Sequence, residues 1–364
     1  MIVHPQQVAI QVPLKLECGN SLPGFTLAYE TYGKLNANKD NAILICHGLT
    51  ATQHAAGRHA PSDPKPGWWD AAIGPGKPFD TEHYFVICIN ALGSFGGSSG
   101  PASLNPDTGH AYGMRFPLVT MADMVKAQAL LADHLHIECF NTIAGGCMGG
   151  FQVLEWLRLY PARLARAVVI SAGARVSPHT IALWKVLSDA IRSDPAWNGG
   201  DYASSQPPEA GLALASRIGS LFWMSRESME NRFGLRLADR EKLSYSFAAD
   251  FEVEAFLDKI GHGAGKIIDA NSLLYLMRAM TYFDLSRSSS LAEVFTGIQS
   301  RTLLVSYESD WRYPPDETEE LNHAIASLNA PVEHKIFDSK FGHGAFIYDF
   351  EGLGAAIRTF LAES

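Results

Sequence analysis

The sequence has few charged residues and gathers none of them into a long basic cluster. Only 18% of its 364 residues are charged, and the formal net charge is -9 at pH 7. Because binding of nucleic-acid phosphates needs concentrated Lys and Arg, this composition argues against a nucleic-acid partner. Small-molecule chemistry is the better expectation.

Cysteines are also scarce. There are five, an odd number, and no two of them form a C-x-x-C pair, so the sequence does not indicate a disulfide framework. Some fall inside apolar, strand-like runs such as "AILIC" and "YFVICIN". We expect most of the cysteines to be reduced residues of the core.

Long hydrophobic runs are absent as well. No stretch approaches the ~18 apolar residues of a membrane span, and the first residues, "MIVHPQQVAIQV", lack the basic and apolar regions of a signal peptide. We therefore expect a soluble, cytoplasmic protein without a membrane partner. The 47% of hydrophobic residues is enough to bury a large globular core.

Short apolar runs alternate with helical patterns in the first half of the chain. The alternation predicts strands at 41–48, 84–90, 141–146 and 165–173, and helices at 120–134 and from Met148. This order is typical of a mostly parallel sheet covered by helices, the α/β class.

After Gly173 the pattern becomes mostly helical until about Thr296. Strand signal then returns in "RTLLVSYESD", followed by a helix at 315–328, a strand in "VEHKIF" and a last helix at 353–361. An excursion of ~120 residues is too long for a structureless loop in a compact domain. We expect a core formed by residues 1–173 and 296–364, with residues 174–295 inserted as a helical lid.

A glycine-rich stretch, "IAGGCMGG", joins a predicted strand to a predicted helix. Gly145 to Gly149 match the G-x-nucleophile-x-G elbow, in which a sharp turn exposes one side chain at a helix N-terminus. Phosphate binding or simple close packing are the alternatives. The stretch lacks the Lys-Ser/Thr of a P-loop and the G-x-G-x-x-G spacing. The elbow interpretation makes Cys147 a candidate nucleophile.

An acid and a histidine follow the elbow in the order that such a site requires. Asp310 comes after the strand near 301–307, and His343 comes just after "VEHKIF", so both should reach the carboxyl edge of the sheet. Other histidines compete for the role: His334 inside a strand, His323 on a helix and His262 in the lid.

A second loop, "HGLTATQHAAG", follows the predicted strand at 41–48. Its backbone amide near Leu49 could donate to an oxyanion, although a simple glycine turn is the alternative. The stretch "DHLHIE" offers two histidines but no third ligand nearby. We expect no metal site, since catalytic zinc needs three protein ligands.

Taken together, these motifs resemble the homoserine O-acetyltransferase family of the α/β-hydrolase fold, and the resemblance covers nearly the whole chain. The stretches that carry it are "YETYGKLNANKDNAILICHGLTATQHAAG", "GSSGPASLNPDTGHAYGMRFPLVTMADMVKAQ", "GGCMGGFQVLEW", "DANSLLYLMRAMTYFDLS" and "SDWRYPP" followed by "GHGAF".

The resemblance implies a two-step acyl transfer. By this resemblance Cys147 is the nucleophile, Asp310 the orienting acid and His343 the base, and Leu49 and Met148 supply the oxyanion amides. It also implies acyl-CoA, with acetyl-CoA the first expectation, as a co-substrate rather than a bound cofactor. The lid would cover a narrow tunnel and mediate a homodimer.

The sequence departs from the family pattern at three positions. The family has serine where this chain has Cys147, and Asp after the catalytic histidine where this chain has Gly344. Arg217 matches the family's carboxylate-binding Arg, but Met224 stands where a Tyr is expected. These departures put homoserine in question as the acceptor.

Three functions remain open from the sequence. The first is acyl transfer from acyl-CoA to a small hydroxyl acceptor through acyl-Cys147. The second is a carboxylic ester hydrolase on the same scaffold, because water needs no acceptor recognition. The third is a binding module that kept the fold and lost catalysis.

Overall fold

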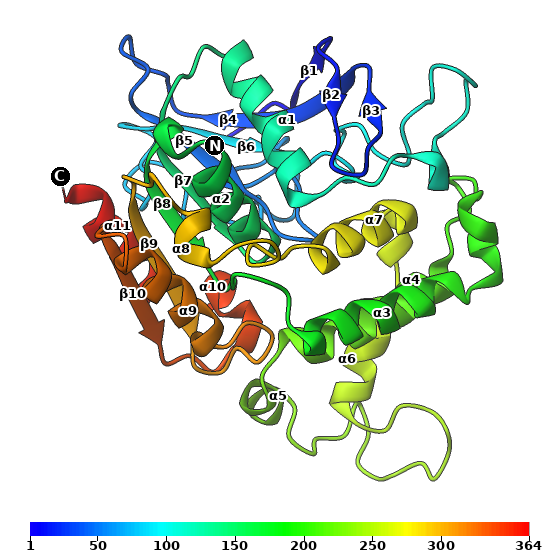
Figure 1. The fold of residues 1–364 in the computed structure, drawn as a ribbon. Helices are drawn as coiled ribbons and strands as arrows, with labels where there is room; N and C mark the ends of the chain where they lie inside the picture. The colour runs from blue at the N-terminus through cyan, green and yellow to red at the C-terminus, as the bar shows by residue number, and fades with distance from the viewer. Residues whose placement is uncertain (364) are drawn as a thin grey trace.

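The computed structural model describes residues 1–363 and centres on one large sheet (Figure 1). Its strand order is β1-β4-β6-β5-β7-β8-β9-β10. The strands are β1 Gln6–Ile10, β4 Phe25–Tyr32, β5 Ala42–Cys46, β6 Phe85–Ile89, β7 Phe140–Gly146, β8 Leu164–Ile170, β9 Arg301–Tyr307 and β10 Val332–Phe337. The strands from β5 to β10 pair in parallel, while β4 is antiparallel to both of its neighbours. The expected mostly parallel sheet is confirmed.

The middle of the sheet is buried on both faces. All five residues of β5 are buried, as are the last residues of β7 and β8, which explains why these strands appear in the sequence as continuous apolar runs. A hairpin of β2 (Leu14–Lys15) and β3 (Ser21–Leu22) lies outside the sheet. Among the described residues, no helix has both the length and the apolar character to cross a membrane.

Helices that follow the strands cover the sheet (Figure 1). The helix α1 (Met121–His134) begins at Thr120, whose hydroxyl accepts the Asp123 amide while the Asp123 carboxylate accepts the Thr120 amide. It packs on α2 (Met148–Leu159), which in turn packs on β7 and β8. The helices on the C-terminal side are α9 Pro315–Ala326, α10 Ala345–Tyr348 and α11 Phe350–Ala362.

A group of helices projects from the carboxyl side of the sheet (Figure 1). They are α3 Pro178–Arg192, α4 Glu209–Trp223, α5 Arg226–Arg232, α6 Glu252–Gly261 and α7 Ala270–Thr281. The short α8 Leu291–Val294 comes after this group and packs on α9. The chain leaves and returns through one neck, where the Val176 amide donates to Phe283 O at 3.2 Å and the Leu285 amide donates to Ala174 O at 3.0 Å. On the outgoing side the neck lies at 174–176, where the lid was expected to begin. On the returning side it lies at 283–285, about ten residues before the expected end of the lid, so the 174–295 division stays a prediction.

Candidate active site

Cys147 stands at the turn between β7 and α2. Its backbone has φ 58° and ψ -123°, a strained conformation for a residue with a side chain. The turn can form only because its neighbours are glycines. A Cβ atom on Gly149 would lie 2.0 Å from the carbonyl oxygen of Cys46, and one on Gly145 would lie 2.6 Å from the backbone of Gly149. The glycines let the helix start against β5 while the thiol faces the cavity beyond the sheet.

The surroundings of Cys147 favour its anion. Burial by itself raises the pKa of the thiol, but the charge of His343, the charge of Arg312 and the amide of Met148 together hold the pKa below its ordinary value. The side chain is buried, with 3% of the residue exposed. The thiolate is the form of cysteine that attacks carbonyl carbon.

Asp310 and His343 come together from the ends of β9 and β10. Asp310 Oδ2 accepts a hydrogen bond from His343 Nδ1 at 2.8 Å, and both side chains are fully buried. Asp310 Oδ1 accepts the amides of Arg312 at 3.0 Å and Tyr313 at 3.2 Å. Burial raises the pKa of Asp310, but His343, the amide of Tyr313 and the charge of Arg312 outweigh it, so the net pKa lies below the ordinary value. The carboxylate therefore stays charged and fixes the orientation of the imidazole.

The opposite nitrogen of His343 is the one available for chemistry. Burial lowers the pKa of His343, while Asp310 and Cys147 raise it by more, so the net pKa is above the ordinary value. No group among residues 1–363 makes a hydrogen bond with Nε2 that meets ordinary distance and angle limits. Trp223 packs edge-on against the ring at 5.1 Å between centroids. The thiol and imidazole thus stabilise each other's charged form.

Two backbone amides are candidates for the oxyanion hole. The Met148 amide already acts on the thiol, because its hydrogen bond lowers the Cys147 pKa. Leu49 lies in the cavity wall beside Cys147, and its amide donates to no backbone group of the described chain. The loop is anchored at His47, whose Nε2 accepts the Ala91 amide at 2.9 Å. Burial lowers the pKa of His47 to about 4, so the ring is neutral and can accept.

The cavity above Cys147 has a volume of about 490 Å³ and mostly apolar walls. Arg312 is the exception that sequence reasoning missed. It is 5% exposed, and its Nε atom has no hydrogen-bond partner within residues 1–363. Its guanidinium carbon stands 5.3 Å from the ring centroid of Trp184. A buried, unpaired guanidinium in a cavity is a candidate anion-binding group. Only its place two residues after Asp310 could have drawn attention to it.

Arg217 does not lie among the residues that form this cavity. Its Nη2 atom forms an ion pair with Asp258 Oδ1 at 3.0 Å, and Nε donates to the Leu257 carbonyl at 3.2 Å. Its helix neighbours Ser216 and Ser220 do line the cavity. The expectation that Arg217 binds a substrate carboxylate stays a prediction, and it would require this ion pair to open.

The rival histidines have structural partners. His334 Nε2 shares a hydrogen bond with Ser306 at 2.7 Å, and its Nδ1 pairs with Glu319 at 2.6 Å. His323 pairs with the same Glu319 at 3.2 Å on the surface of α9. His262 lines the cavity and holds the Asp258 carbonyl at 2.7 Å through Nδ1. His343 is therefore the histidine that both hydrogen-bonds a carboxylate and lies next to Cys147.

One cluster combines ligand types that metals use. Atoms of Glu30, His54 and His59 lie within 4.8 Å of one another. The buried Glu30 carboxylate accepts hydrogen bonds from His54 at 2.9 Å, His59 at 2.7 Å and the Tyr32 hydroxyl at 3.0 Å. These bonds satisfy the buried charge without an ion. The cluster ties the loop that carries Leu49 to β4.

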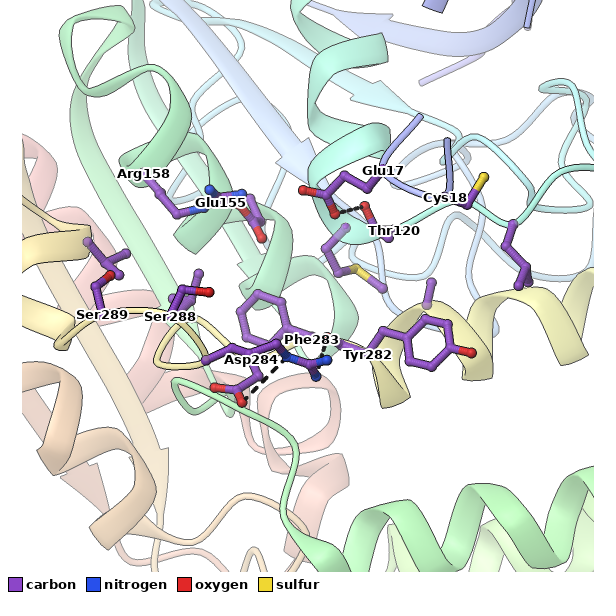
Figure 2. A pocket seen from close by; sticks show the side chains of 16 residues that line it. Glu17, Cys18, Thr120, Glu155, Arg158, Tyr282, Phe283, Asp284, Ser288 and Ser289 are labelled. Atoms are coloured by element: carbon purple, nitrogen blue, oxygen red, sulfur yellow. Dashed lines mark hydrogen bonds and ion pairs between the residues drawn. The ribbon is translucent and has the colours of Figure 1, made fainter. Parts of the chain in front are cut away.

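A second pocket, with about the same volume of 490 Å³, lies between α1, α2 and the segment after α7 (Figure 2). Its charged groups pair among themselves. Glu155 forms an ion pair with Arg158 at 2.6 Å, and Asp284 forms one with Arg287 at 3.9 Å. Glu17 accepts a hydrogen bond from the Thr120 hydroxyl at 2.6 Å. Cys147 is not among its lining residues. The pocket therefore belongs to the packing of the neck region and adds no group to the site.

Comparison with known sequences extends over nearly the whole chain. Residues 41–350 match the family described as "alpha/beta hydrolase fold". A homoserine O-succinyltransferase of Acidithiobacillus ferrooxidans is 44% identical over 363 residues, 99% of this chain and 95% of that protein. A homoserine O-acetyltransferase of Geobacter sulfurreducens is 44% identical over 362 residues, 99% and 98% of the two chains.

Comparison with solved structures agrees. The homoserine O-acetyltransferase of Bacillus anthracis superimposes with a TM-score of 0.92 at 28% identity, covering 100% of this chain and 99% of that one. Esterase E22 superimposes with a TM-score of 0.90, also at 28% identity, covering 99% and 100%. With 44% identity along almost its full length to such transferases, the chain belongs to the homoserine O-acetyltransferase family of the α/β-hydrolase fold and is an O-acyltransferase.

Proposed function

We propose that the protein transfers an acyl group from acyl-CoA to a small hydroxyl compound through an acyl-Cys147 intermediate. The observation that carries this proposal is the buried arrangement of a thiol with a depressed pKa beside an imidazole that hydrogen-bonds a carboxylate at 2.8 Å. No metal or permanent cofactor takes part in the proposed steps. Cys147, His343 and Asp310 form the proposed catalytic triad.

In the first step the Cys147 thiolate attacks the thioester carbonyl. The resulting oxyanion is held by the amides of Leu49 and Met148. The carbon–sulfur bond to CoA then breaks, and the leaving thiolate takes its proton from the His343 imidazolium. One thioester replaces another of similar energy, so this step is freely reversible.

In the second step the acceptor hydroxyl attacks the acyl-enzyme. His343, now neutral, removes the hydroxyl proton as the oxygen–carbon bond forms, and the Cys147 thiolate leaves. Asp310 keeps Nδ1 protonated, so that Nε2 is the basic nitrogen. The helices from α3 to α7 are proposed to act as a lid that limits attack by water.

Arg312 favours an acyl group that carries a carboxylate. The sequence led us to expect acetyl-CoA, but an acetyl group offers nothing to a buried guanidinium. A succinyl-type chain on Cys147 would place a carboxylate in the cavity where Arg312 has an unpaired Nε. The A. ferrooxidans relative is a succinyltransferase by name. We propose succinyl-CoA as the better donor and acetyl-CoA as the weaker one.

Intact-mass spectrometry after mixing with each CoA thioester tests this function. We expect an acyl adduct on the native protein, none on Cys147→Ala, and an unchanged adduct on Cys18→Ala, whose thiol is exposed. Arg312→Gln should lower the rate of acylation by succinyl-CoA by about 10-fold or more relative to acetyl-CoA, since a desolvated charge pair is lost. Absence of any adduct would refute the proposal. Rapid release of acetate from a simple aryl acetate, without CoA turnover, would favour the ester hydrolase instead.

We also propose that the protein is a cytoplasmic homodimer that associates through its lid. The segment between α5 and α6 exposes large apolar side chains: Leu235 is 87% exposed and Tyr245 93% exposed, and Phe247 is fully exposed. Such a patch favours a protein contact. Sedimentation of the wild type and of Phe247→Glu checks this, and a monomeric wild type would contradict it.

A further inference from the structure

We infer that the acyl acceptor of this enzyme is a hydroxyl compound without an ammonium group. The inference rests on the proposed acyl transfer and concerns the second step only. It follows from the charges of the cavity above Cys147.

The cavity offers no carboxylate to a positively charged substrate. Its lining residues include no Asp or Glu, and they are mostly apolar or aromatic, among them Trp68, Trp184, Trp223 and Phe346. The fixed charge in the wall is Arg312, which is positive. An ammonium group entering this space would give up its hydration without meeting a carboxylate, and it would also meet the like charge of Arg312 wherever the acyl group itself carries no carboxylate.

The acids nearest the cavity are not available to a ligand. Both oxygens of Asp310 are occupied by His343 and by the amides that follow it in the chain. Glu317 does not line the cavity. It packs against Gly173, so closely that a Cβ atom on Gly173 would lie 3.1 Å from the Glu317 side chain. Asp258 pairs with Arg217. No carboxylate in the described chain therefore points into the space where an acceptor would meet acyl-Cys147.

The residue beside His343 shows how the space for an acid is filled. A Cβ on Gly344 would lie 2.5 Å from Nε1 and 3.0 Å from Cε2 of the Trp223 indole. A carboxylate at position 344 therefore cannot coexist with this indole where it stands. Trp223 is itself held between the rings of His343, at 5.1 Å, and Phe346, at 6.0 Å.

The N–H edge of Trp223 cannot accept a hydrogen bond from an ammonium group. An indole N–H can only donate a hydrogen bond, and an ammonium group can only donate as well. This N–H edge suits an acceptor substituent that can accept a hydrogen bond. Trp223 fills the space beside His343 in which a carboxylate could stand, and Arg312 supplies the charge that determines specificity.

Two acceptors that differ only by the amino group test the inference. The acyl-enzyme is prepared with acetyl-CoA, so that no acyl carboxylate occupies Arg312, verified by intact mass, and mixed with L-homoserine or with 4-hydroxybutanoate. Loss of the adduct is followed with buffer alone as the blank. We expect 4-hydroxybutanoate to react at least about 30-fold faster in second-order rate, because the ammonium group enters unpaired.

A matched pair of variants tests the residues. Trp223→Ala combined with Gly344→Asp opens the space and supplies a carboxylate, so it should shift the ratio of the two rates toward homoserine by at least about 10-fold. Trp223→Ala alone opens the same space without the charge and should leave the ratio within about threefold of the wild type. The comparison of acceptors on the native enzyme stands even if the double variant does not fold.

The outcomes separate the two levels of the proposal. If no acyl adduct forms on Cys147, the proposed function itself is wrong, and the acceptor inference falls with it. If the adduct forms and homoserine reacts as fast as 4-hydroxybutanoate, the transfer stands and this inference is overturned. If neither acceptor exceeds the buffer blank, the inference is also overturned, and the ester hydrolase is favoured.

Discussion

Replacing Asp310 by Asn tests the electrostatic basis of the proposed nucleophile. The carboxylate accepts a hydrogen bond from His343 Nδ1 at 2.8 Å, and both groups are fully buried, so solvent screens the pair very little. Asparagine keeps the shape and removes the charge. Burial lowers the pKa of His343, and Asp310 is the largest of the groups that raise it again. In Asp310→Asn the pKa of His343 should therefore fall. The pKa of Cys147 should rise in turn, since its thiolate loses a charged partner.

The size of the effect follows from the role of the acid. Loss of the orienting carboxylate in a buried triad lowers the rate by about 10³–10⁴-fold, which corresponds to about 4–5 kcal/mol of transition-state stabilisation. The amide also offers its NH₂ group to Nδ1, which favours the wrong tautomer of His343. We therefore expect acylation by CoA thioester to slow by about three orders of magnitude or more.

Alkylation by iodoacetamide measures the thiolate without any substrate. The modification rate of Cys147 is followed against pH by peptide mass spectrometry, with exposed Cys18 as the internal reference. In the wild type the lowered pKa keeps Cys147 reactive as pH falls below the range of an ordinary thiol. In Asp310→Asn the midpoint should move to higher pH, and in Asp338→Asn, which changes an exposed acid, it should not move. Equal midpoints in all three proteins would refute this account of the site.

Three further predictions concern the scaffold. Gly149→Ala places a Cβ 2.0 Å from the Cys46 carbonyl oxygen. Urea unfolding should therefore show that the free energy of unfolding falls by at least ~2 kcal/mol. An unchanged unfolding midpoint would contradict the close approach at this turn. Burial, and then Asp316, raises the pKa of Glu317 to about 7. The folded state therefore binds more protons than the unfolded state between pH ~4.5 and 7, and stability is lost as the pH rises through this range. Glu317→Gln should raise Tm at pH 8 and change it little at pH 4. Equal shifts of Tm at both pH values would contradict this. His59→Gln weakens the bonding of the buried Glu30 carboxylate and should cost about 1.5–3 kcal/mol by urea unfolding, whereas EDTA should leave the wild-type midpoint in place.

The sequence predicted the parallel half of the sheet and failed on the antiparallel edge. The strands β5, β7 and β8 are buried on both faces, so each appears as an uninterrupted apolar run. The strand β4 was not predicted, because its sequence "FTLAYETY" buries Glu30. The histidines that compensate that charge lie 24 and 29 residues further along the chain. A distant partner of this kind is invisible to a local pattern.

The candidate site divides in the same way. Cys147, Asp310 and His343 could be proposed because the elbow is local and its partners follow in a fixed order. Arg312 and Trp223 could not. Arg312 matters because its Nε atom has no partner, and Trp223 matters because its indole lies 2.5 Å from where a Cβ on Gly344 would stand. Neither fact can be inferred from the type of a residue or from the spacing of a motif.

The buried polar groups of the Glu30 cluster and those around Cys147 differ in how well they are satisfied. At the Glu30 cluster every strong group of a buried network has its partner. Of the ten buried side-chain atoms that lack a partner within residues 1–363, four belong to residues around Cys147: Trp184 Nε1, Arg312 Nε, Tyr313 Oη and His343 Nε2. Folding alone disfavours such groups, because each loses water without gaining a protein partner. His343 Nε2 is the nitrogen that acts on Cys147, whose pKa His343 lowers. The N–H groups of Trp184 and Arg312, which line the cavity, predict a substrate that presents acceptor oxygens to them.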